Sequence, residues 1–410
     1  MKIGIIFDGI EIPPKSGVAF RLYYLSKKLE EKGVRVVMFL CERGWVSHND
    51  LKKEPFVFHI FSPEVFYKKI DFVKNVISKE KPDIIQVNNS SSVLSYGAYY
   101  SNELRIPLVT EMHDCDAIIK KTLGCDRQDI DISEFIQYSA GYLSHEVICM
   151  TPKDKKEFIH MGILKDKINL IPNGIDTDYF KYNSPNLPKR QIIFLGNMFY
   201  EPNRNAAEIA IKMIVPHINA RLLCIGMVED SFRRKFSSDK VVFTGGVDDI
   251  RPFLKESSIA IAPVFEGSGM KVKLLNYAAS GLPIVSTEMG ISGYPRNIAI
   301  IENDITKYPK LVEKLLDDLK VATEQSKKAR EIVCKKFSFD FIAEKVIKLY
   351  KKTKFKKKRS SFVLGVKDKE KKNKIFFQRL SPLPMWLEEK RVKFSSTVPD
   401  YITLNYENRN

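Results

Sequence analysis

Two closely spaced glycines followed by two lysines are the residues of this sequence best suited to hold an anion. Gly267 and Gly269 follow a short apolar run and precede a helical pattern from about Met270 to Ser280. Glycines let the backbone turn sharply and come close to a ligand, and the unpaired N–H groups at the start of a helix favour negative charge. Lys271 and Lys273 add two cations there. A bound pyrophosphate would explain this pattern, and a surface turn with solvated lysines is the alternative.

Polar residues also follow two predicted strands in the first half of the chain. Asn88 and Asn89 end one apolar run, and His113 and Asp114 directly follow another. Ligands of open α/β sheets gather at the carboxyl ends of parallel strands, so these side chains are candidates to line a site. His113 is the candidate for chemistry. Polar turn residues and a structural histidine are the alternatives.

Alternating apolar runs and helical patterns place these residues in two successive arrays. The first array opens with Lys2 to Phe7, and the loop DGIEIPPKSG that follows lacks the GxGxxG pattern of a dinucleotide-binding turn. A break at Pro172-Asn173-Gly174 separates it from the second array, which contains the apolar run Ile259 to Val264. Two arrays of this kind predict two doubly wound α/β domains that face each other across a cleft. Such clefts are favoured places for ligands.

Composition is that of a globular protein with an unusually basic balance. The 410 residues carry a formal net charge of +17, and six cysteines are scattered without a CxxC pair. This cysteine usage suits a reducing cytosol and argues against a disulfide framework or a zinc site. No apolar run approaches the roughly 20 residues that span a bilayer. Met1 leads directly into an apolar strand, so we expect no signal peptide.

Four stretches of the second half together resemble retaining GT-B glycosyltransferases of family 4. They read IPNGIDTDYF, FLGNMFYEPNRNA, TGGVDDIRPFL and APVFEGSGMKVKLLNYAASGLPIVST. Near the N-terminus, PPKSGVAFRLYYLSKKLEEKGVRV and KPDIIQV fit the opening of the same family. The resemblance covers roughly residues 1 to 352, and it is the combination of motifs that is specific.

The resemblance implies an α/β protein of GT-B architecture, with two Rossmann-like doubly wound domains facing across a cleft and a basic C-terminal extension. We expect residues 1–172 to form an N-terminal acceptor domain and residues 173–337 a nucleotide-sugar domain. Residues 338–352 are predicted to form a C-terminal helix that packs back on the N-terminal domain, and residues 353–410 the extension.

The resemblance also implies a site for a nucleoside-diphosphate sugar, with no cofactor and no metal ion. It places Gly17 in a loop that approaches the donor phosphates, His113 near the transferred sugar, and Lys271 where it neutralises the pyrophosphate. We expect catalytic roles for His113, Glu266 and Lys271. The donor-binding residues that it implies are Gly17, Gly196, Asn197, Arg204, Val247, Gly267, Ser268, Gly269, Met270, Lys273 and Asn276.

The sequence departs from the family pattern around the glycine turn. Many members carry a Glu that holds the sugar and, after seven residues, a second Glu that holds the ribose. Here Ser268 and Asn276 occupy those positions, and Glu266 lies two positions from the first. Asn276 can hydrogen-bond a ribose hydroxyl, although without a charge.

A second departure lies in the first loop of the second domain. Asn197 stands where the family commonly has Arg, and Pro202 and Asn203 occupy the position of a common Lys. Arg204 is a candidate substitute. These changes resemble a subgroup with GxGxKxK text.

Two basic runs follow the last predicted helix. They are Lys351 to Arg359 and Lys367 to Lys374, and Trp386 beyond them indicates some ordered packing. Such runs attract anionic membrane surfaces or nucleic acid, and a solvated basic tail is the alternative. We favour the membrane over nucleic acid, by analogy with lipid-linked acceptors in the family.

The sequence therefore predicts a cytoplasmic, metal-independent, retaining glycosyltransferase that attaches peripherally to the inner face of a membrane. Its donor would be a nucleoside-diphosphate sugar, and its acceptor a glycan, a lipid-linked sugar or another hydroxyl. A nucleotide-sugar epimerase is one alternative, although only His113 and Glu266 offer acid–base groups around the sugar. A non-catalytic GT-B protein that binds a sugar or nucleotide is the other.

Overall fold

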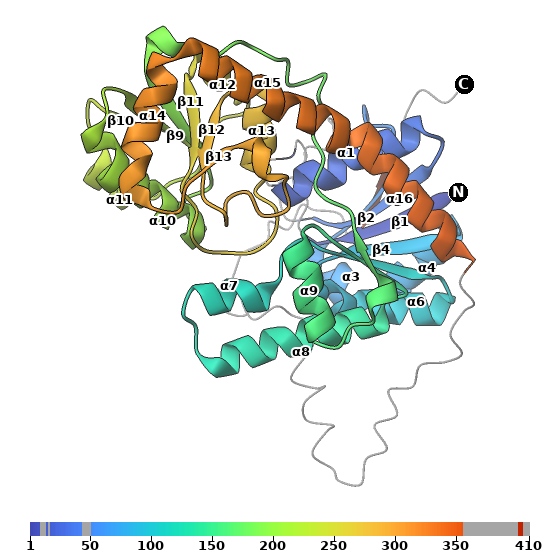
Figure 1. Ribbon diagram of the computed structural model, residues 1–410. Helices are drawn as coiled ribbons and strands as arrows, with labels where there is room; N and C mark the ends of the chain where they lie inside the picture. Colours follow the sequence, from blue (N-terminus) through green and yellow to red (C-terminus); the bar gives the residue numbers. More distant parts are fainter. Residues whose placement is uncertain (9–13, 15–16, 43–50, 356–400, 405–410) are drawn as a thin grey trace.

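The computed structural model describes residues 1–8, 14, 17–42, 51–355 and 401–404, which form two lobes (Figure 1). Each lobe is a β-sheet with helices packed on its faces, and all described strands are parallel except one at the edge of the first sheet. The central strands of both sheets are short apolar runs whose side chains are buried on both faces, as expected when helices cover both sides of a sheet. The predicted two-domain α/β architecture is confirmed.

The first sheet has the strand order β14-β3-β2-β1-β4-β5-β6-β7 within the described residues. Strands β1 to β7 pair in parallel, whereas β14 pairs antiparallel with β3 at the edge. The chain after the basic runs therefore returns to the first domain. The bounds are β1 Lys2–Phe7, β2 Arg35–Cys41, β3 Val57–Phe61, β4 Ile84–Asn88, β5 Leu108–Met112, β6 Glu146–Cys149, β7 Ile168–Leu170 and β14 Tyr401–Leu404.

Helices of the first lobe connect successive strands, and side-chain caps mark several of their starts. Asp126 accepts a hydrogen bond from the backbone N–H of Asp129 at the start of α8, and Thr151 accepts one from Asp154 at the start of α9. The bounds are α1 Gly17–Glu31, α3 Pro63–Lys68, α4 Ile70–Glu80, α5 Ser90–Ser92, a π-helical stretch Val93–Gly97, α6 Ala98–Leu104, α7 Asp116–Thr122, α8 Arg127–Leu143, α9 Pro152–His160 and a 3₁₀ turn Lys165–Lys167.

The second sheet is wholly parallel, with the order β10-β9-β8-β11-β12-β13. Its strands are β8 Gln191–Leu195, β9 Arg221–Ile225, β10 Val241–Gly245, β11 Ile259–Ala262, β12 Ile284–Ser286 and β13 Ile300–Ile301. Its helices are α10 Glu201–Ile209 with a π-helical continuation Ala210–Ile214, α11 Asp230–Phe236, α12 Arg251–Glu256, α13 Val272–Ser280, α14 Tyr308–Asp317 and α15 Leu319–Lys336. Short 3₁₀ turns lie at Leu187–Lys189, Val215–His217, Arg296–Ile298 and Ile305–Lys307.

The helix after the glycine turn begins at Val272, two residues later than the sequence pattern predicted. Gly269 has a φ of +69° and Lys271 is extended, so neither can belong to a right-handed helix. The turn is therefore longer than predicted, and Lys271 is the residue that precedes the first helical turn.

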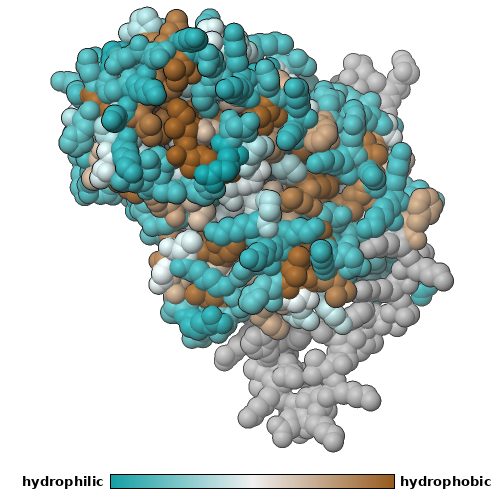
Figure 2. Space-filling model, in the orientation of Figure 1, coloured by the Kyte–Doolittle hydropathy of each residue, from teal (hydrophilic) through white to brown (hydrophobic). Residues whose placement is uncertain are grey.

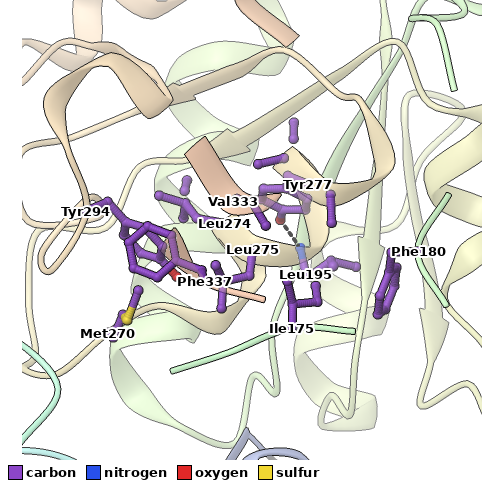
Figure 3. Packing of buried hydrophobic residues seen from close by; sticks show 14 of the residues in the cluster. Ile175, Phe180, Leu195, Met270, Leu274, Leu275, Tyr277, Tyr294, Val333 and Phe337 are labelled. Carbon is purple, nitrogen blue, oxygen red and sulfur yellow. Dashed lines mark hydrogen bonds between the residues drawn. The ribbon is translucent and has the colours of Figure 1, made fainter. Parts of the chain in front are cut away.

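The connection between the domains is packed into the core of the second domain (Figure 3). Ile175 and Phe180, which follow the crossover, are buried in the same cluster as Leu195, Leu275 and Tyr277. The Tyr277 hydroxyl accepts a hydrogen bond of 2.6 Å from the backbone N–H of Leu195, so the polar end of this buried ring is satisfied. This packing fixes α13, and hence the glycine turn, relative to β8.

A long helix, α16 Phe339–Lys354, leaves the second domain and lies along the first (Figure 1). Its first ring, Phe339, stacks on Tyr24 of α1 at 5.8 Å between ring centroids. Lys32, the residue after α1, forms ion pairs with Asp340 and Glu344. The helix thus packs against α1 and brings Tyr350, which is fully buried, over the first sheet.

The molecular face in Figure 2 is largely hydrophilic, with hydrophobic side chains gathered in a few patches. Among the described residues, no helix combines the length and the apolar character that crossing a membrane requires.

Candidate functional site

The first helix of the N-terminal domain and α13 of the second domain begin beside each other. Gly17 is the first residue of α1, and a Cβ placed on it would lie 3.4 Å from Cγ2 of Val272, the first residue of α13. Lys271 provides no side-chain cap to α13, so the first N–H groups of that helix have no capping partner from it. Two helix N-termini, each with a partial positive charge, therefore converge at one point between the domains.

The glycine turn is held against the first domain by three hydrogen bonds. The backbone N–H of Gly267 donates to Thr122 Oγ1 at 3.0 Å, and the backbone N–H of Cys115 donates to Ser268 Oγ at 3.0 Å. Ser268 Oγ in turn donates to Asp154 Oδ1 at 2.5 Å. Ser268 is therefore buried and engaged with protein groups, and the turn links the second domain to the loop after β5.

Gly269 allows a close approach between the domains. A Cβ at this position would lie 2.0 Å from Asp114 Oδ1 and 2.8 Å from the carbonyl oxygen of His113. No side chain can occupy that space without displacing the loop after β5. The two residues that follow β5, His113 and Asp114, are thereby brought directly onto the glycine turn.

The two lysines after the turn point into the protein. Lys271 Nζ donates to the carbonyl oxygen of Ser268. Lys273 Nζ donates to Asn203 Oδ1 at 2.8 Å and lies 4.1 Å from the centroid of the Phe194 ring. Burial and, to a lesser extent, the charge of Lys271 together lower the pKa of Lys273 to about 7. The alternative of solvated surface lysines is wrong for Lys273, which is 9% exposed.

The ammonium of Lys271 sits among carboxylates of the first domain. Burial lowers the pKa of Lys271, whereas the charges of Asp114 and Asp154 oppose that change. Burial raises the pKa of Asp114 to about 7; Lys271 acts against this, and Asp154 and Asp116 add to it. The site therefore combines cations with a carboxyl group that changes its charge near neutral pH.

His113 is held in a buried polar cluster. Its Nε2 lies 3.4 Å from Asn88 Nδ2 and 3.7 Å from Glu111 Oε2. Glu111 Oε1 accepts hydrogen bonds from Arg21 Nε at 3.0 Å and Nη2 at 2.7 Å. Burial lowers the pKa of His113 to about 4, against the attraction of Glu111, so the ring is neutral at pH 7.

Arg21 connects this cluster to the crossover between the domains. Its Nη1 donates to the carbonyl oxygen of Pro172 at 2.5 Å, and Nη2 lies 3.4 Å from that of Ile171. Burial by itself would raise the pKa of Glu111, but Arg21 and His113 outweigh it and hold the pKa below its usual value. The guanidinium thus compensates a carboxylate that is 1% exposed.

The first loop of the second domain is braced by its own side chains. Asn203 Nδ2 donates to the carbonyl oxygen of Asn197 at 3.0 Å, and a Cβ on Gly196 would lie 2.9 Å from Asn203 Cγ. Arg204 Nη2 pairs with Glu229 Oε1 at 2.7 Å, so the candidate substitute for the missing Lys is engaged with a carboxylate.

The remaining predicted residues lie around this loop and turn. Glu266 Oε2 accepts a hydrogen bond of 2.9 Å from Asn205 Nδ2, which comes from α10. Met270 Sδ accepts one of 3.3 Å from the backbone N–H of Asn173 at the crossover. Asn276 is half-buried in α13, and Val247 is half-buried after β10. Their roles toward a donor stay predictions.

Two family models match this chain and together span more than half of it. The model described as Glycosyl transferases group 1 matches residues 189–318. The model described as Glycosyltransferase Family 4 matches residues 15–179. The chain belongs to the group 1, family 4 glycosyltransferases.

Relatives of this glycosyltransferase extend across most of its length. An uncharacterized glycosyltransferase of Methanocaldococcus jannaschii, MJ1607, is 25% identical over 322 residues, which cover 71% of this chain and 80% of that protein. The phosphatidylinositol N-acetylglucosaminyltransferase GPI3 subunit of Saccharomyces cerevisiae is 25% identical over 350 residues, covering 77% of this chain and 72% of that one.

Solved structures show that the glycosyltransferase has the GT-B fold. Anabaena Alr3699/HepE, crystallised in complex with UDP, superposes with a TM-score of 0.67 at 14% identity and covers 86% of this chain and 100% of its own. Sucrose-phosphate synthase from Thermosynechococcus elongatus has a TM-score of 0.66 at 15% identity, covering 85% of this chain and 98% of its own.

Several residues that build the site of this glycosyltransferase were not indicated by the sequence patterns. Arg21, Glu111 and Thr122 hold His113 and the glycine turn in place, yet none belongs to a quoted motif that predicts such a role. One feature of the sequence did indicate a role for Glu111. A carboxylate inside an apolar strand, two residues before His113, must find a partner when it is buried. The identity of that partner depends on the fold.

Proposed function

We propose that the protein transfers a sugar from a nucleoside-diphosphate sugar to a hydroxyl acceptor, with retention of the anomeric configuration. The observation that carries this proposal is the meeting of α1 and α13 at Gly17 and Val272, with Lys271 directly preceding α13 and its ammonium group on the glycine turn. Two helix N-termini and a lysine suit a diphosphate better than any neutral ligand. The HepE structure in complex with UDP and glucose supports a nucleotide-sugar donor.

In the proposed reaction, the bond between the anomeric carbon and the diphosphate oxygen breaks, and a bond to the acceptor oxygen forms. The O–H bond of the acceptor hydroxyl breaks in the same step, and the leaving diphosphate takes up the proton. The leaving diphosphate gains negative charge as it departs, and groups already aimed at it stabilise the transition state. Lys271, the N-terminus of α13 and the N-terminus of α1 are the groups that we propose for this task. We infer that they act without a metal ion or another cofactor.

His113 and Glu266 are the residues that we propose to face the transferred sugar. His113 follows β5 and is neutral at pH 7, so one ring nitrogen can donate a hydrogen bond and the other can accept one. Glu266 is half-buried and bonded to Asn205, which orients its carboxylate from the second domain. We propose that Asn276 holds the ribose.

The proposed acceptor is a glycan, a lipid-linked sugar or another hydroxyl compound. The name of the yeast relative, phosphatidylinositol N-acetylglucosaminyltransferase, describes a lipid acceptor for that protein. We propose that this enzyme likewise works in the cytoplasm at the inner face of a membrane. Of the basic runs predicted to attach it, only Lys351 to Phe355 lie within the described residues, and Trp386 lies outside them.

Binding of UDP, GDP and a panel of their sugars, measured by isothermal titration calorimetry, tests the diphosphate site. Lys271→Ala removes one charged hydrogen-bond donor, so we expect donor affinity to fall about 10- to 100-fold, the equivalent of about 1.5–3 kcal/mol. Lys327→Ala on the exposed face of α15 is the matched control and should bind as the wild type does. A folded Lys271→Ala protein with unchanged affinity would refute the assignment.

Product analysis separates the proposed transferase from the other two activities. With an acceptor, the anomeric configuration of the product measured by NMR should match that of the donor. Conversion of the donor to an epimer without acceptor would instead identify an epimerase. Donor binding with neither transfer nor hydrolysis across the panel would identify a binding protein.

A further inference from the structure

A row of buried polar side chains joins the C-terminal helix to His113. The Tyr350 hydroxyl of α16 contacts Gln86 Oε1, and Gln86 Nε2 lies 3.4 Å from Asn88 Oδ1. Asn88 Nδ2 then lies 3.4 Å from His113 Nε2. Gln86 and Asn88 are two residues apart on β4, so both side chains leave the same face of the strand.

Each link in this row has a direction, because an amide has a donor end and an acceptor end. The Tyr350 hydroxyl donates to the oxygen of Gln86, which leaves the nitrogen of Gln86 to donate to Asn88. The oxygen of Asn88 is thereby occupied, and its nitrogen donates toward His113. A neutral imidazole accepts through its unprotonated nitrogen only, so Nε2 must carry the lone pair and Nδ1 the hydrogen.

The opposite direction would require the Tyr350 hydroxyl to accept and then to donate its own hydrogen elsewhere. Tyr350 is fully buried, and no described residue other than Gln86 accepts a hydrogen bond from its hydroxyl. A buried hydroxyl that does not donate is costly. Burial also raises the pKa of Tyr350, so the hydroxyl keeps its hydrogen.

Glu111 is the one charged group that would favour a hydrogen on Nε2. Its Oε2 is buried without a hydrogen-bond partner among the described residues, and it lies 3.7 Å from that nitrogen, which is beyond hydrogen-bond distance. Its other oxygen accepts two hydrogen bonds from Arg21, whose guanidinium compensates the negative charge. The row from Tyr350 therefore decides the proton position on His113.

We propose that Tyr350 is a positioning residue that fixes His113 as the tautomer with hydrogen on Nδ1, through Gln86 and Asn88. No described residue accepts a hydrogen bond from Nδ1, so this N–H is available to donate to a bound sugar or its acceptor. The catalytic meaning of this tautomer rests on the proposed function. The tautomer itself does not, because it is set by the protein alone.

The ¹⁵N and ¹H NMR spectrum of protein labelled at histidine tests this proposal directly. Protonated and unprotonated ring nitrogens have well-separated ¹⁵N shifts, and the His113 signals are assigned by their loss in His113→Ala. We expect the wild type to show the hydrogen on Nδ1. A hydrogen on Nε2 in the wild type would overturn the proposal, whatever the activity of the enzyme.

Tyr350→Phe should release the row, and the His113 signals should move toward a mixture of both tautomers. Gln86→Leu breaks the same row at another link and should give the same spectrum as Tyr350→Phe. The second variant keeps the test decisive if one of the two folds poorly. Tyr100→Phe is the matched control, because Tyr100 is a buried tyrosine of the first domain whose hydroxyl has no hydrogen-bond partner among the described residues.

Turnover with a donor identified by calorimetry separates this proposal from the proposed function. We expect a fall in kcat of about 10-fold in Tyr350→Phe, with an unchanged donor affinity. If the tautomer shifts as expected but kcat does not, the row is established and the role of His113 in transfer is refuted. An unchanged tautomer in both Tyr350→Phe and Gln86→Leu refutes the row.

Discussion

Gly269 offers the sharpest test of how the two domains meet. It has a φ of +69°, and a Cβ placed on it would lie 2.8 Å from a backbone oxygen and 2.0 Å from Asp114 Oδ1. The Asp114 carboxylate belongs to a side chain and can rotate away, but the carbonyl oxygen of His113 moves only with the strand end. Gly269→Ala therefore combines backbone strain with a steric conflict between the domains.

Gly124 separates these two effects. Its φ is +71°, almost the same as that of Gly269, but a Cβ on it would meet no atom within 4 Å. Gly124→Ala should cost about 1–2 kcal/mol, the strain of a left-handed alanine. Gly269→Ala should cost about 1–3 kcal/mol more, the usual penalty for overpacking a tight contact. For domains of this size, that excess lowers the unfolding midpoint by about 2–12 °C relative to Gly124→Ala.

Differential scanning calorimetry of both variants, together with titration of UDP, measures the two consequences. The conflict at Gly269 also displaces the turn from Thr122 and Cys115, so we expect weaker UDP binding in Gly269→Ala and wild-type binding in Gly124→Ala. The domain contact described here is refuted if the two variants have the same midpoint and bind UDP equally well.

Two further predictions concern the buried charges. Arg21→Met leaves Glu111 buried without its cation and should lower the free energy of unfolding by about 3–5 kcal/mol, and adding Glu111→Gln should restore part of that loss. Urea denaturation monitored in the first domain measures this free energy. A double variant no more stable than Arg21→Met would contradict the prediction. Asp114 binds a proton between pH 4 and 7 in the folded state only, so its contribution to stability falls as pH rises through that range and stays low above about 7. The stability of Asp114→Asn relative to the wild type should therefore increase as the pH is raised from about 5 to about 8. Its upper limit is about 4 kcal/mol, which corresponds to raising the carboxyl pKa from 3.8 to about 7. A difference in unfolding midpoint between the two proteins that does not change with pH would disprove the assigned pKa.

The elements of the fold follow from local patterns of the sequence. Runs such as Ile3 to Phe7 and Ile259 to Ala262 are apolar at every position, and a segment without a polar face must be covered on both sides. Their alternation with amphipathic helices defines two parallel sheets. The glycine turn was also predictable, since two glycines separated by one residue precede a helix and both adopt positive φ.

The start of α13 was not predictable to the residue. The apolar and basic text MKVKLL continues without a break from turn to helix, and nothing in it marks where the backbone becomes helical. The docking of the turn on the loop after β5 decides this, because the docked turn has Gly267 and Gly269 at positive φ and Lys271 extended.

The contacts of the candidate site depend on residues far apart in the chain. Arg21 and Glu111 are separated by 90 positions, and Tyr350 and Gln86 by 264, so no local pattern relates them. Lys273 looks like a solvated helix-start lysine in the sequence, yet the burial of α13 directs its ammonium onto Asn203 and Phe194.

The sequence alone determined where the strands, the glycine turn and the candidate histidine lie, because spacing and hydrophobicity act over a few residues. Only the tertiary structure decided that Asp114 and Asp154 meet the turn of the other domain, and that Tyr350 reaches the row leading to His113. Those pairings form only when the two sheets and α16 pack together. They depend on the free energy of the whole folded chain, because no single segment contains both partners.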